Sequence, residues 1–382
     1  MRRLGTVLAF AAFGVYWGAW GVLVPDVKEQ VDATVGELGI ALLAIGLAAL
    51  PAMLVTGRLV DRVGARVMPA ALLLFALAAL LPGLAGSVPQ LALALVLVGA
   101  TSGALDVVIN VAASGLEASA GRRLMQVAHA AFSAGFLVAA LSVGFARAAG
   151  AEPAAVLAGT SALLVLTALL NRGHSSAGPT ASGARRLRFS RRLLLLGVLC
   201  GVAFVVESGL ENWSALFLET ELDASPAIGG LGPGLFAAAM VAGRMLGHWL
   251  EAVVGDRLLL VGGALTAGGG LALAAVAPAV PVALAGFTLG GAGISVAAPT
   301  LFGAAGRGAP DAERGSAVAS VTTVSYLGFL GGPPLMGVVS GGVGLRGGMA
   351  MLAGVAVLLA AATASFAGSA LSLRRLQHPP RG

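Results

Sequence analysis

The sequence predicts an all-α membrane protein with twelve transmembrane helices in two pseudo-symmetric six-helix bundles. Of its 382 residues, 58% are hydrophobic and only 10% are charged, which leaves too little polar surface for a water-soluble globule of this size. Apolar stretches long enough to cross a bilayer recur along the whole chain. The basic residues also gather on one side of the predicted spans, as they do in membrane proteins.

Apolar stretches of roughly 18 to 25 residues mark the spans. The first six are expected at 4–25, 37–57, 67–86, 91–114, 124–146 and 153–171. The last six are expected at 193–218, 227–250, 257–277, 280–304, 315–340 and 347–371. The first stretch lacks a small-residue cleavage site and continues into Pro25 and Asp26, so we interpret it as a retained span rather than a signal peptide. The glycines in the ninth and tenth spans are expected to pack helices together.

Charge placement predicts the topology. If the N-terminus lies inside, 20 Lys and Arg residues fall on the cytoplasmic side and three, Lys28, Arg147 and Arg346, fall outside. The outer loops carry eight acids: Asp26, Glu29, Asp32, Glu37, Glu152, Glu219, Glu221 and Asp223. This asymmetry predicts that both termini lie in the cytoplasm and that the protein lies in an inner membrane. The net charge of +6 is therefore a topology signal, and no nucleic-acid partner is expected.

The spans divide into two halves of six. Residues 172–192 form the longest polar stretch and end in a basic cluster, so we expect bundles at 1–171 and 193–382 joined by a cytoplasmic linker. Weak internal repeats support two parallel halves. Gly57-Arg58-Leu59 closes the second span, and Gly243-Arg244-Met245 lies near the end of the eighth. Gly99-Ala100 and Gly291-Ala292 have nearly the same separation.

The turn after the second span carries the strongest motif. It reads Gly57-Arg58-Leu59-Val60-Asp61-Arg62-Val63-Gly64-Ala65-Arg66 and resembles the signature loop of the major facilitator superfamily. Two helix ends must meet there in a tight turn, which glycine permits, while arginines stay among lipid headgroups. The resemblance implies a cytoplasmic gate formed by Gly57, Arg58, Asp61, Arg62, Gly64 and Arg66. The alternative is a basic turn that only sets the topology.

A narrower resemblance covers most of the chain. The segments 20–28, 36–66, 105–135, 207–218, 291–307 and 326–337 look like the YbjJ-type branch, which is related to the fucose permeases. The resemblance implies the major facilitator fold and transport, and says little about the solute. In that branch the seventh span carries a Glu and, five residues later, an Asp. Here Glu207 and Trp213 fit, but Asn212 replaces the second acid and Glu211 stands beside it.

Four ionisable residues inside the apolar spans are candidates for proton coupling: Asp106, Glu207, Glu211 and His129. An ionised side chain at the bilayer centre costs about 2.5 to 3.5 kcal/mol on insertion scales. No Lys or Arg is expected well inside the spans, so His129 is the only predicted cationic partner. We expect an acid that ionises only when water reaches it to carry a coupling proton.

Helical spacing groups polar residues in the fourth and fifth spans. Asp106 and Asn110 are four residues apart, and so are His129 and Ser133. We expect these four side chains to line the cytoplasmic half of a central cavity. The alternative is a hydrogen-bonded clasp between helices, although such bonds contribute only about 0.6 kcal/mol on average.

The seventh span combines acids with aromatic residues. Glu207 and Glu211 share one helix face and should titrate as a pair. Aromatic and polar side chains that could bind a sugar or another flat solute are Tyr16, Trp17, Trp20, Asn212, Trp213 and Tyr326. The alternative for the tryptophans and Tyr16 is an anchor at the membrane interface.

The eleventh span contains a predicted hinge at Gly331-Gly332-Pro333-Pro334. Proline removes helix hydrogen bonds and glycine allows bending, so this segment is expected to flex beside the transport pathway. The alternative is a static kink.

These features favour a secondary active transporter that rocks two halves around a midplane site and is driven by protons. Import of a sugar-like solute is favoured, and a proton-driven exporter of a drug or metabolite is the alternative. A membrane sensor that binds solute without moving it is the rival of another class. An enzyme is not expected, because no metal-binding His-Glu-x-x-His motif is present. We expect no cofactor and no metal, and a monomer whose partners are protons, a small molecule and lipid.

Overall fold

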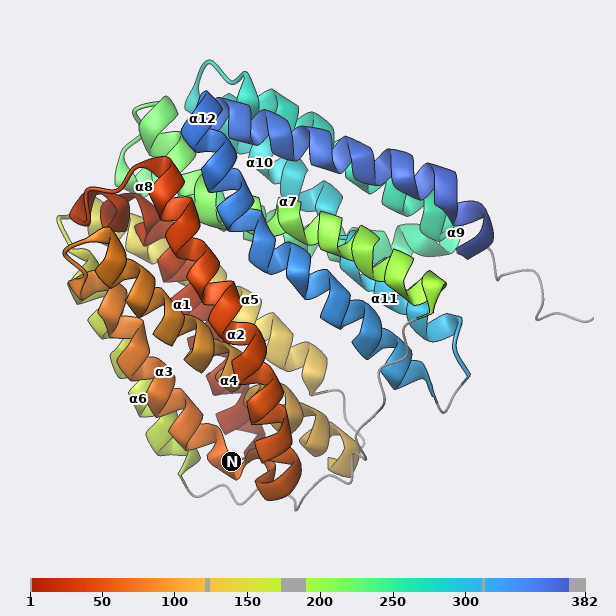
Figure 1. Cartoon of the computed structure of the whole chain (residues 1–382), viewed down its shortest axis with the longest axis horizontal. Helices are drawn as coiled ribbons and strands as arrows, with labels where there is room; N and C mark the ends of the chain where they lie inside the picture. Colours follow the sequence, from red (N-terminus) through yellow and green to blue (C-terminus); the bar gives the residue numbers. More distant parts are fainter. Residues whose placement is uncertain (1, 121–123, 173–189, 311–312, 371–382) are drawn as a thin grey trace, which may run out of the picture. The chain divides into compact units, whose positions relative to one another are not determined.

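The computed structural model describes residues 2–120, 124–172, 190–310 and 313–370, and these are helical with short turns (Figure 1). Ten helices among them are long and apolar enough to cross a membrane. The longest of these, Ser316–Ser365, contains the non-helical residue Gly344 and so counts as two spans. A shorter apolar helix, Met68–Leu84, completes the set of twelve. The predicted fold class is therefore confirmed.

The first six spans follow the predicted order. Their elements are α1 (Arg2–Gln30), α2 (Val35–Val63), α3 (Met68–Leu80) with the 3-10 turn η2 (Leu81–Leu84), α4 (Val88–Ala120), α5 (Met125–Ala148) and α6 (Pro153–Asn171). Thr34 begins α2 with a capping box, since its hydroxyl accepts from the Glu37 N–H and the Glu37 carboxylate accepts from the Thr34 N–H. The 3-10 turn η1 (Gly64–Val67) joins α2 to α3.

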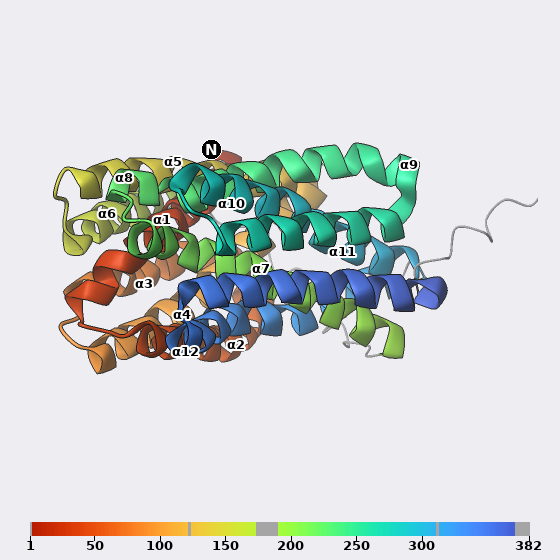
Figure 2. The same ribbon diagram turned by 90° about the horizontal axis from the view of Figure 1, so that it is seen from above.

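The last six spans are joined by tighter turns than the sequence indicated. They comprise α7 (Arg191–Glu221), the short α8 (Pro226–Gly229), α9 (Leu231–Ala275), α10 (Val280–Ile294), α11 (Ala297–Arg307) and α12 (Arg314–Ala370). Gly255 (φ 77°) breaks α9 into two spans, and Gly344 (φ 78°) does the same in α12. Figure 2 shows α9 folding back on itself at such a turn. Glycine suits these positions because side chains disfavour positive φ.

The predicted tenth span, 280–304, is interrupted, which corrects the expectation of one continuous helix. Residues 295 and 296 form a turn between α10 and α11. Pro299 supplies the reason, because a proline ring clashes with the carbonyl four residues earlier, here that of Ser295. The Ser295 hydroxyl turns back and donates to the Ala292 carbonyl at 2.7 Å.

Close glycine contacts show how the spans of the first half pair. A Cβ added at Gly14 of α1 would lie 2.0 Å from the Phe132 carbonyl oxygen of α5. One at Gly99 of α4 would lie 2.2 Å from the Ile45 carbonyl oxygen of α2. One at Gly83 would lie 2.8 Å from the Cα of Ala154 in α6. The first span therefore pairs with the fifth, the second with the fourth and the third with the sixth.

The second half repeats this scheme. A Cβ at Gly328 would lie 1.9 Å from the Gly201 carbonyl oxygen, which pairs the eleventh span with the seventh. One at Gly243 would meet Ala292, and one at Gly268 would meet Ala353, which pairs the eighth span with the tenth and the ninth with the twelfth. Gly263 and Gly270 also contact the tenth span, as predicted for packing glycines. The same three pairings in both halves confirm the predicted pseudo-symmetry.

The chain forms two compact units. Unit 1 comprises Met1–Gly183, Glu211–Ala237 and Pro333–Gly344, and unit 2 comprises Ala184–Leu210, Ala238–Gly332 and Leu345–Gly382. Most of the predicted linker at 172–192 lies outside the described residues. Its boundaries, and those of the two predicted bundles, therefore stay predictions.

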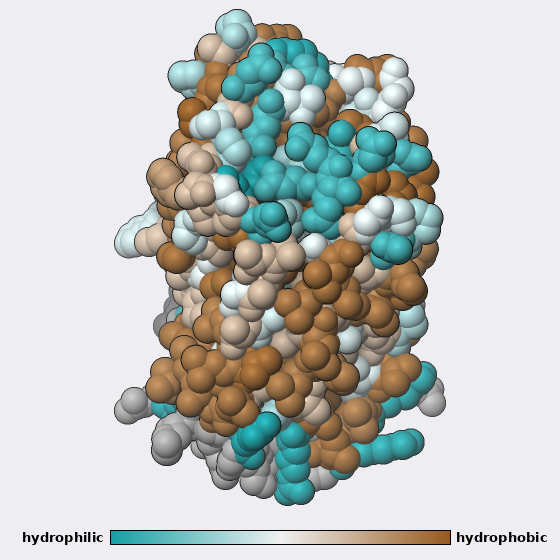
Figure 3. Space-filling model, turned by 90° about the vertical axis from the view of Figure 1, so that its left-hand side faces the viewer, coloured by the Kyte–Doolittle hydropathy of each residue, from teal (hydrophilic) through white to brown (hydrophobic). Residues whose placement is uncertain are grey.

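The surface is that of a membrane protein. Large apolar side chains are exposed in the middle of helices, including Leu47 (66%), Leu258 (65%) and Leu358 (67%). Figure 3 shows a face on which hydrophobic residues form a broad region, with hydrophilic residues gathered above it and a few below it. Such a surface needs hydrocarbon as its solvent.

Candidate solute-binding and gating sites

An ion pair lies deep within the helices of unit 2. Glu207 is near the middle of α7, and its Oε1 is 3.5 Å from Nη2 of Arg244 in α9. The Glu207 side chain is 17% exposed and the Arg244 side chain is 42% exposed. This corrects the expectation that no arginine lies well inside the spans, because Arg244 is far from the Gly255 turn that ends the eighth span.

Aromatic rings adjoin this ion pair. Phe204 precedes Glu207 by three residues, so the two share a face of α7. The Phe204 ring contacts Phe302 of α11 and Phe329 of α12 edge-on, at centroid distances of 6.5 and 5.9 Å. Tyr326, a predicted solute-binding residue, lies 6.4 Å from Phe329. All four rings are half-buried. The phenylalanines were not predicted, because a phenylalanine in an apolar span carries no signal that separates it from lipid-facing residues.

Polar residues of the fourth and fifth spans belong to unit 1. The Asn110 side-chain amide donates to Oδ1 of Asp106 at 3.0 Å and to the Asp106 carbonyl at 2.9 Å, and both side chains are half-buried. The exposed His129 ring packs edge-on against Phe10 of α1, with centroids 5.1 Å apart. The Ser133 hydroxyl donates to the His129 carbonyl at 3.1 Å. A shared cavity lined by all four residues stays a prediction.

Trp20, Trp213 and Tyr16 are buried within the protein. Trp20 is 1% exposed and Trp213 is fully buried, and the Trp213 indole N–H donates to the Pro333 carbonyl at 3.1 Å. Tyr16 is also fully buried, with its ring edge-on to Phe75 at 4.7 Å. Trp17 is half-buried. Burial of Tyr16, Trp20 and Trp213 is inconsistent with a place among lipid headgroups.

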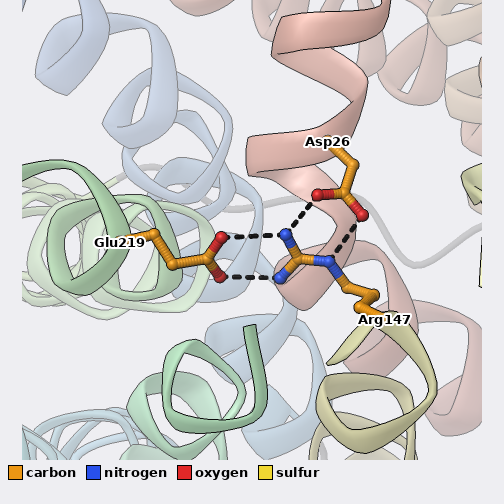
Figure 4. Close-up of polar contacts among 3 residues, drawn as sticks. All are labelled: Asp26, Arg147 and Glu219. Atoms are coloured by element: carbon orange, nitrogen blue, oxygen red, sulfur yellow. Dashed lines mark hydrogen bonds and ion pairs between the residues drawn. The ribbon is translucent and has the colours of Figure 1, made fainter. Parts of the chain in front are cut away.

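Three charged residues from distant helix ends form one cluster, which we call the outer triad: Asp26, Arg147 and Glu219 (Figure 4). Arg147 donates through Nε to Asp26 at 2.6 Å, and its Nη2 also bonds the same carboxylate. Its Nη1 and Nη2 donate to the Glu219 carboxylate at 2.7 and 2.9 Å. The Arg147 side chain is only 1% exposed, and each of the two edges of its guanidinium group donates two hydrogen bonds to one carboxylate.

The triad ties α7 to α1 and α5. Glycine makes room for it, because a Cβ at Gly229 would lie 2.0 Å from Oε1 of Glu219. The sequence predicts all three residues in outer loops, but it does not predict their pairing. Asp26 and Glu219 are 121 and 72 residues from Arg147, and no local pattern shows pairing at such a separation.

Comparison with known proteins now decides the family. A family model described as Major Facilitator Superfamily matches residues 5–255 and 212–379. The chain belongs to the major facilitator superfamily. An uncharacterized MFS-type transporter of Yersinia pestis is 33% identical over 344 residues, covering 89% of each chain. Membrane protein MosC of Rhizobium meliloti is 29% identical over 368 residues, covering 94% of this chain and 89% of that protein.

Solved structures show the same fold. A bacterial homologue of the human lysosomal transporter Spinster has a TM-score of 0.79 at 16% identity, with 95% of both chains covered. The nucleoside transporter NupG has a TM-score of 0.77 at 14% identity, covering 95% of this chain and 98% of that one. The fucose:proton symporter of E. coli has a TM-score of 0.62 at 17% identity, with 95% and 98% covered.

The superfamily consists of membrane transporters, so this chain is a multi-pass membrane transporter and not an enzyme. The narrower likeness to the YbjJ-type branch stays a prediction. Within the described ranges, no group of three or more His, Cys, Asp or Glu residues could hold a metal ion.

The signature loop of this superfamily member turns at Gly64, whose φ of 69° requires glycine. Arg58, Arg62 and Arg66 are exposed. The close backbone approach predicted at Gly57 is not found among the described residues, because a Cβ there would meet nothing within 4 Å. The side chain of the predicted gate residue Asp61 lies outside the described residues.

The second half of the transporter has a matching turn that sequence analysis missed. Gly255 has nearly the φ of Gly64 and is separated from it by about half the chain. Beside it, Nη1 of Arg307 lies 3.3 Å from Glu251, and Nη2 of Arg307 pairs with Asp256. The Arg307 side chain is 52% exposed, so this pairing contributes little stability by itself. The Gly-Asp-Arg letters at 255–257 were the available signal.

The predicted hinge keeps helical backbone dihedrals, since the only non-helical residue in α12 is Gly344. Gly331 has open space around it, whereas a Cβ at Gly332 would lie 2.1 Å from the Ser208 hydroxyl oxygen. Pro333 and Pro334 are buried. Asn212 is 9% exposed and Glu211 is half-buried, both in α7. The hinge and the roles of Glu211 and Asn212 stay predictions.

Proposed function

We propose that this protein is a proton-coupled secondary active transporter that imports a small, sugar-sized solute by alternating access. The observation that carries the proposal is the Glu207–Arg244 ion pair. Both residues lie near the middle of apolar helices, where a charge is costly and is usually kept for function.

The ion pair supports proton coupling because, within the described ranges, the Glu207 carboxylate has one ion-pair partner and the contact is weak. At 3.5 Å the contact with Arg244 is longer than a normal charge-assisted hydrogen bond. Glu207 can therefore exchange Arg244 for a proton when the pathway opens to the other side of the membrane. Asp106 is a second candidate, with Asn110 donating to its carboxylate.

The outer triad supports a gate on the outer side. Alternating access requires the helices of the two predicted halves to separate on one side at a time. Arg147 and Asp26 both belong to the first half and can stay together. The bond between Arg147 and Glu219 joins the halves and must break for outward opening.

The turns at Gly64 and Gly255 support a gate on the cytoplasmic side. Both lie at helix ends that the positive-inside rule places in the cytoplasm, together with the two termini. Arg307 with Glu251 and Asp256 would brace the second of these turns within its own half. We place the transporter in the bacterial inner membrane, working as a monomer.

Uptake into proteoliposomes tests the proposal. Liposomes containing the full chain and a lumenal pH dye are given an inward proton gradient and a panel of sugars and sugar acids. We expect at least one solute to accelerate proton entry, and Glu207→Gln to remove about nine-tenths of this coupled flux, a tenfold effect. The matched control is Glu152→Gln, an exposed acid outside the ion pair. Coupled flux that persists in both Glu207→Gln and Asp106→Asn would contradict the proposal.

A further inference from the structure

Arg244 lies at a depth in its helix where a charged side chain is costly in a membrane. At 1.5 Å per residue it lies about 20 Å along the helix from Leu231 and about 16 Å from the Gly255 turn. The hydrocarbon core is about 30 Å thick, so the guanidinium is near its middle. A structural arginine at such a depth would be expected to be buried and fully paired.

Arg244 is neither buried nor saturated. A guanidinium has five N–H donors in a planar fork. Among the described residues, its one ion pair is the contact at 3.5 Å with Glu207. Its side chain is 42% exposed, whereas that of Glu207 is 17% exposed. The cation is therefore the more accessible member of the pair.

The surroundings of Glu207 fit a ring-shaped or apolar body. Phe204 lies one helical turn away and contacts Phe302 and Phe329, and Tyr326 extends the group. Half-buried rings provide faces for stacking and for C–H contacts. A solute that binds Arg244 would thus place its remaining atoms near these rings.

We propose that Arg244 binds the carboxylate of the transported solute, which is a small organic acid with a ring or apolar body. This inference rests on the proposed function and names its substrate class. A carboxylate matches the planar fork with two parallel hydrogen bonds. A cationic solute would be repelled by the exposed guanidinium, and a neutral one would leave the ion pair in place.

The proposal also explains how solute and proton are linked. The substrate carboxylate and Glu207 compete for one guanidinium. When the substrate occupies Arg244, Glu207 is left without its partner in a low-dielectric site and accepts the coupling proton. One anion and one proton then cross together, and the step is electrically neutral.

Pairs of probes that differ only in a carboxylate against a hydroxymethyl group test the inference. They are benzoate with benzyl alcohol, galacturonate with galactose, and lactate with 1,2-propanediol. Binding to the full chain is measured by thermal stabilisation, and uptake by coupled proton entry in proteoliposomes. We expect at least one acid to bind about tenfold or more tightly than its neutral partner.

Two substitutions at Arg244 distinguish the effect of its positive charge from the effect of its planar guanidinium group. Arg244→Gln should abolish the preference for the acid over its neutral partner. Arg244→Lys should weaken binding of the acid about threefold, so that the acid still binds more tightly than its neutral partner. Arg172→Gln, which removes an exposed arginine at the end of α6, should change nothing. Melting temperatures of the ligand-free variants show that each is folded.

The outcomes distinguish this inference from the proposed function. If neutral probes bind as tightly as the acids, if no acid binds, or if Arg244→Gln keeps the affinity for the acid, the inference is wrong. Proton-coupled entry of a neutral probe would leave the proposed function standing without it. Binding of an acid that never moves with protons would uphold the anion site and overturn the coupling.

Discussion

Arg147 and Arg244 lie in apolar helices and each pairs with a carboxylate, but their environments are opposite. Arg147 is 1% exposed and makes four hydrogen bonds to two carboxylates. The Arg244 side chain is 42% exposed, and its one ion pair among the described residues is the 3.5 Å contact with Glu207. A saturated guanidinium holds helices together, whereas an unsaturated one is free to exchange partners. This contrast is the basis for proposing a gate at Arg147 and a binding site at Arg244.

The largest expected effect is the loss of Arg147. Arg147→Met leaves two poorly solvated carboxylates without a partner, so we expect a loss of stability of about 3 kcal/mol. Arg244→Met removes a partly exposed arginine from a weak pair, and should cost about 1 kcal/mol or less. Thermal unfolding of the two purified variants at one heating rate measures the difference. Arg147→Lys, which keeps the charge but loses the fork, should fall between them, and equal losses would break the comparison.

Two glycines of α12 provide the next test, one in each unit. A Cβ at Gly337 would lie 2.3 Å from the Cα of Gly39, whereas one at Gly331 would meet nothing within 4 Å. Gly337→Ala should therefore destabilise the protein by about 2 kcal/mol. Gly331→Ala should leave stability unchanged or raise it by about 0.5 kcal/mol, because the backbone there is helical.

The same two variants, Gly331→Ala and Gly337→Ala, also test the predicted hinge. If flexing at 331–334 is part of the transport cycle, Gly331→Ala should slow coupled uptake although its melting temperature is not lowered. Uptake at the unaltered rate would leave a static helix at this position. A melting temperature as low as that of Gly337→Ala would show that the open space around Gly331 is occupied.

The smallest expected effect is on access to the triad. Glu219→Gln weakens the bond that joins the two halves by roughly 1 kcal/mol, which corresponds to about a fivefold shift in an open population. Ala215 is fully buried one helical turn from Glu219, so the variant Ala215→Cys can report this opening by its reaction with a thiol reagent. The background for this variant is Cys200→Ala, because Cys200 is the only cysteine in the sequence. Labelling by an impermeant maleimide from outside should rise about fivefold.

The matched control for this labelling is Glu152→Gln, which removes an exposed acid from the same predicted side. Equal labelling with and without Glu219→Gln would show that the triad does not gate access. Such a result would reduce the triad to a structural clamp and would leave the assignment of Arg244 untouched.

Features summed over many residues were predictable from the sequence. Each span rests on about twenty apolar residues, so single exceptions do not disturb it. The topology rests in the same way on the whole set of basic residues and stays a prediction. The span order, the fold class and the family followed from these sums and from the loop at Gly57 to Arg66. The pseudo-symmetry was visible as short repeats and is now supported by matching helix pairs.

Features that depend on one residue and its distant partner were not predictable. Arg244 was assigned to the end of its span, because hydropathy averages conceal a single charge within a long apolar stretch. Its pairing with Glu207 and the three-way contact at Arg147 bring together helices far apart in the chain. Burial of Trp20 and Trp213 likewise depends on neighbouring helices and not on their position near a span end.

The turns at Gly255 and Gly344 have a mechanical consequence. In each, a single residue departs from helical dihedrals between two long helical parts. A connection that short has no slack, so tilting one member of the pair must swing the other at the same moment. Lengthening either turn by a few flexible residues would allow the two helical parts to tilt independently while leaving every side chain described above in place.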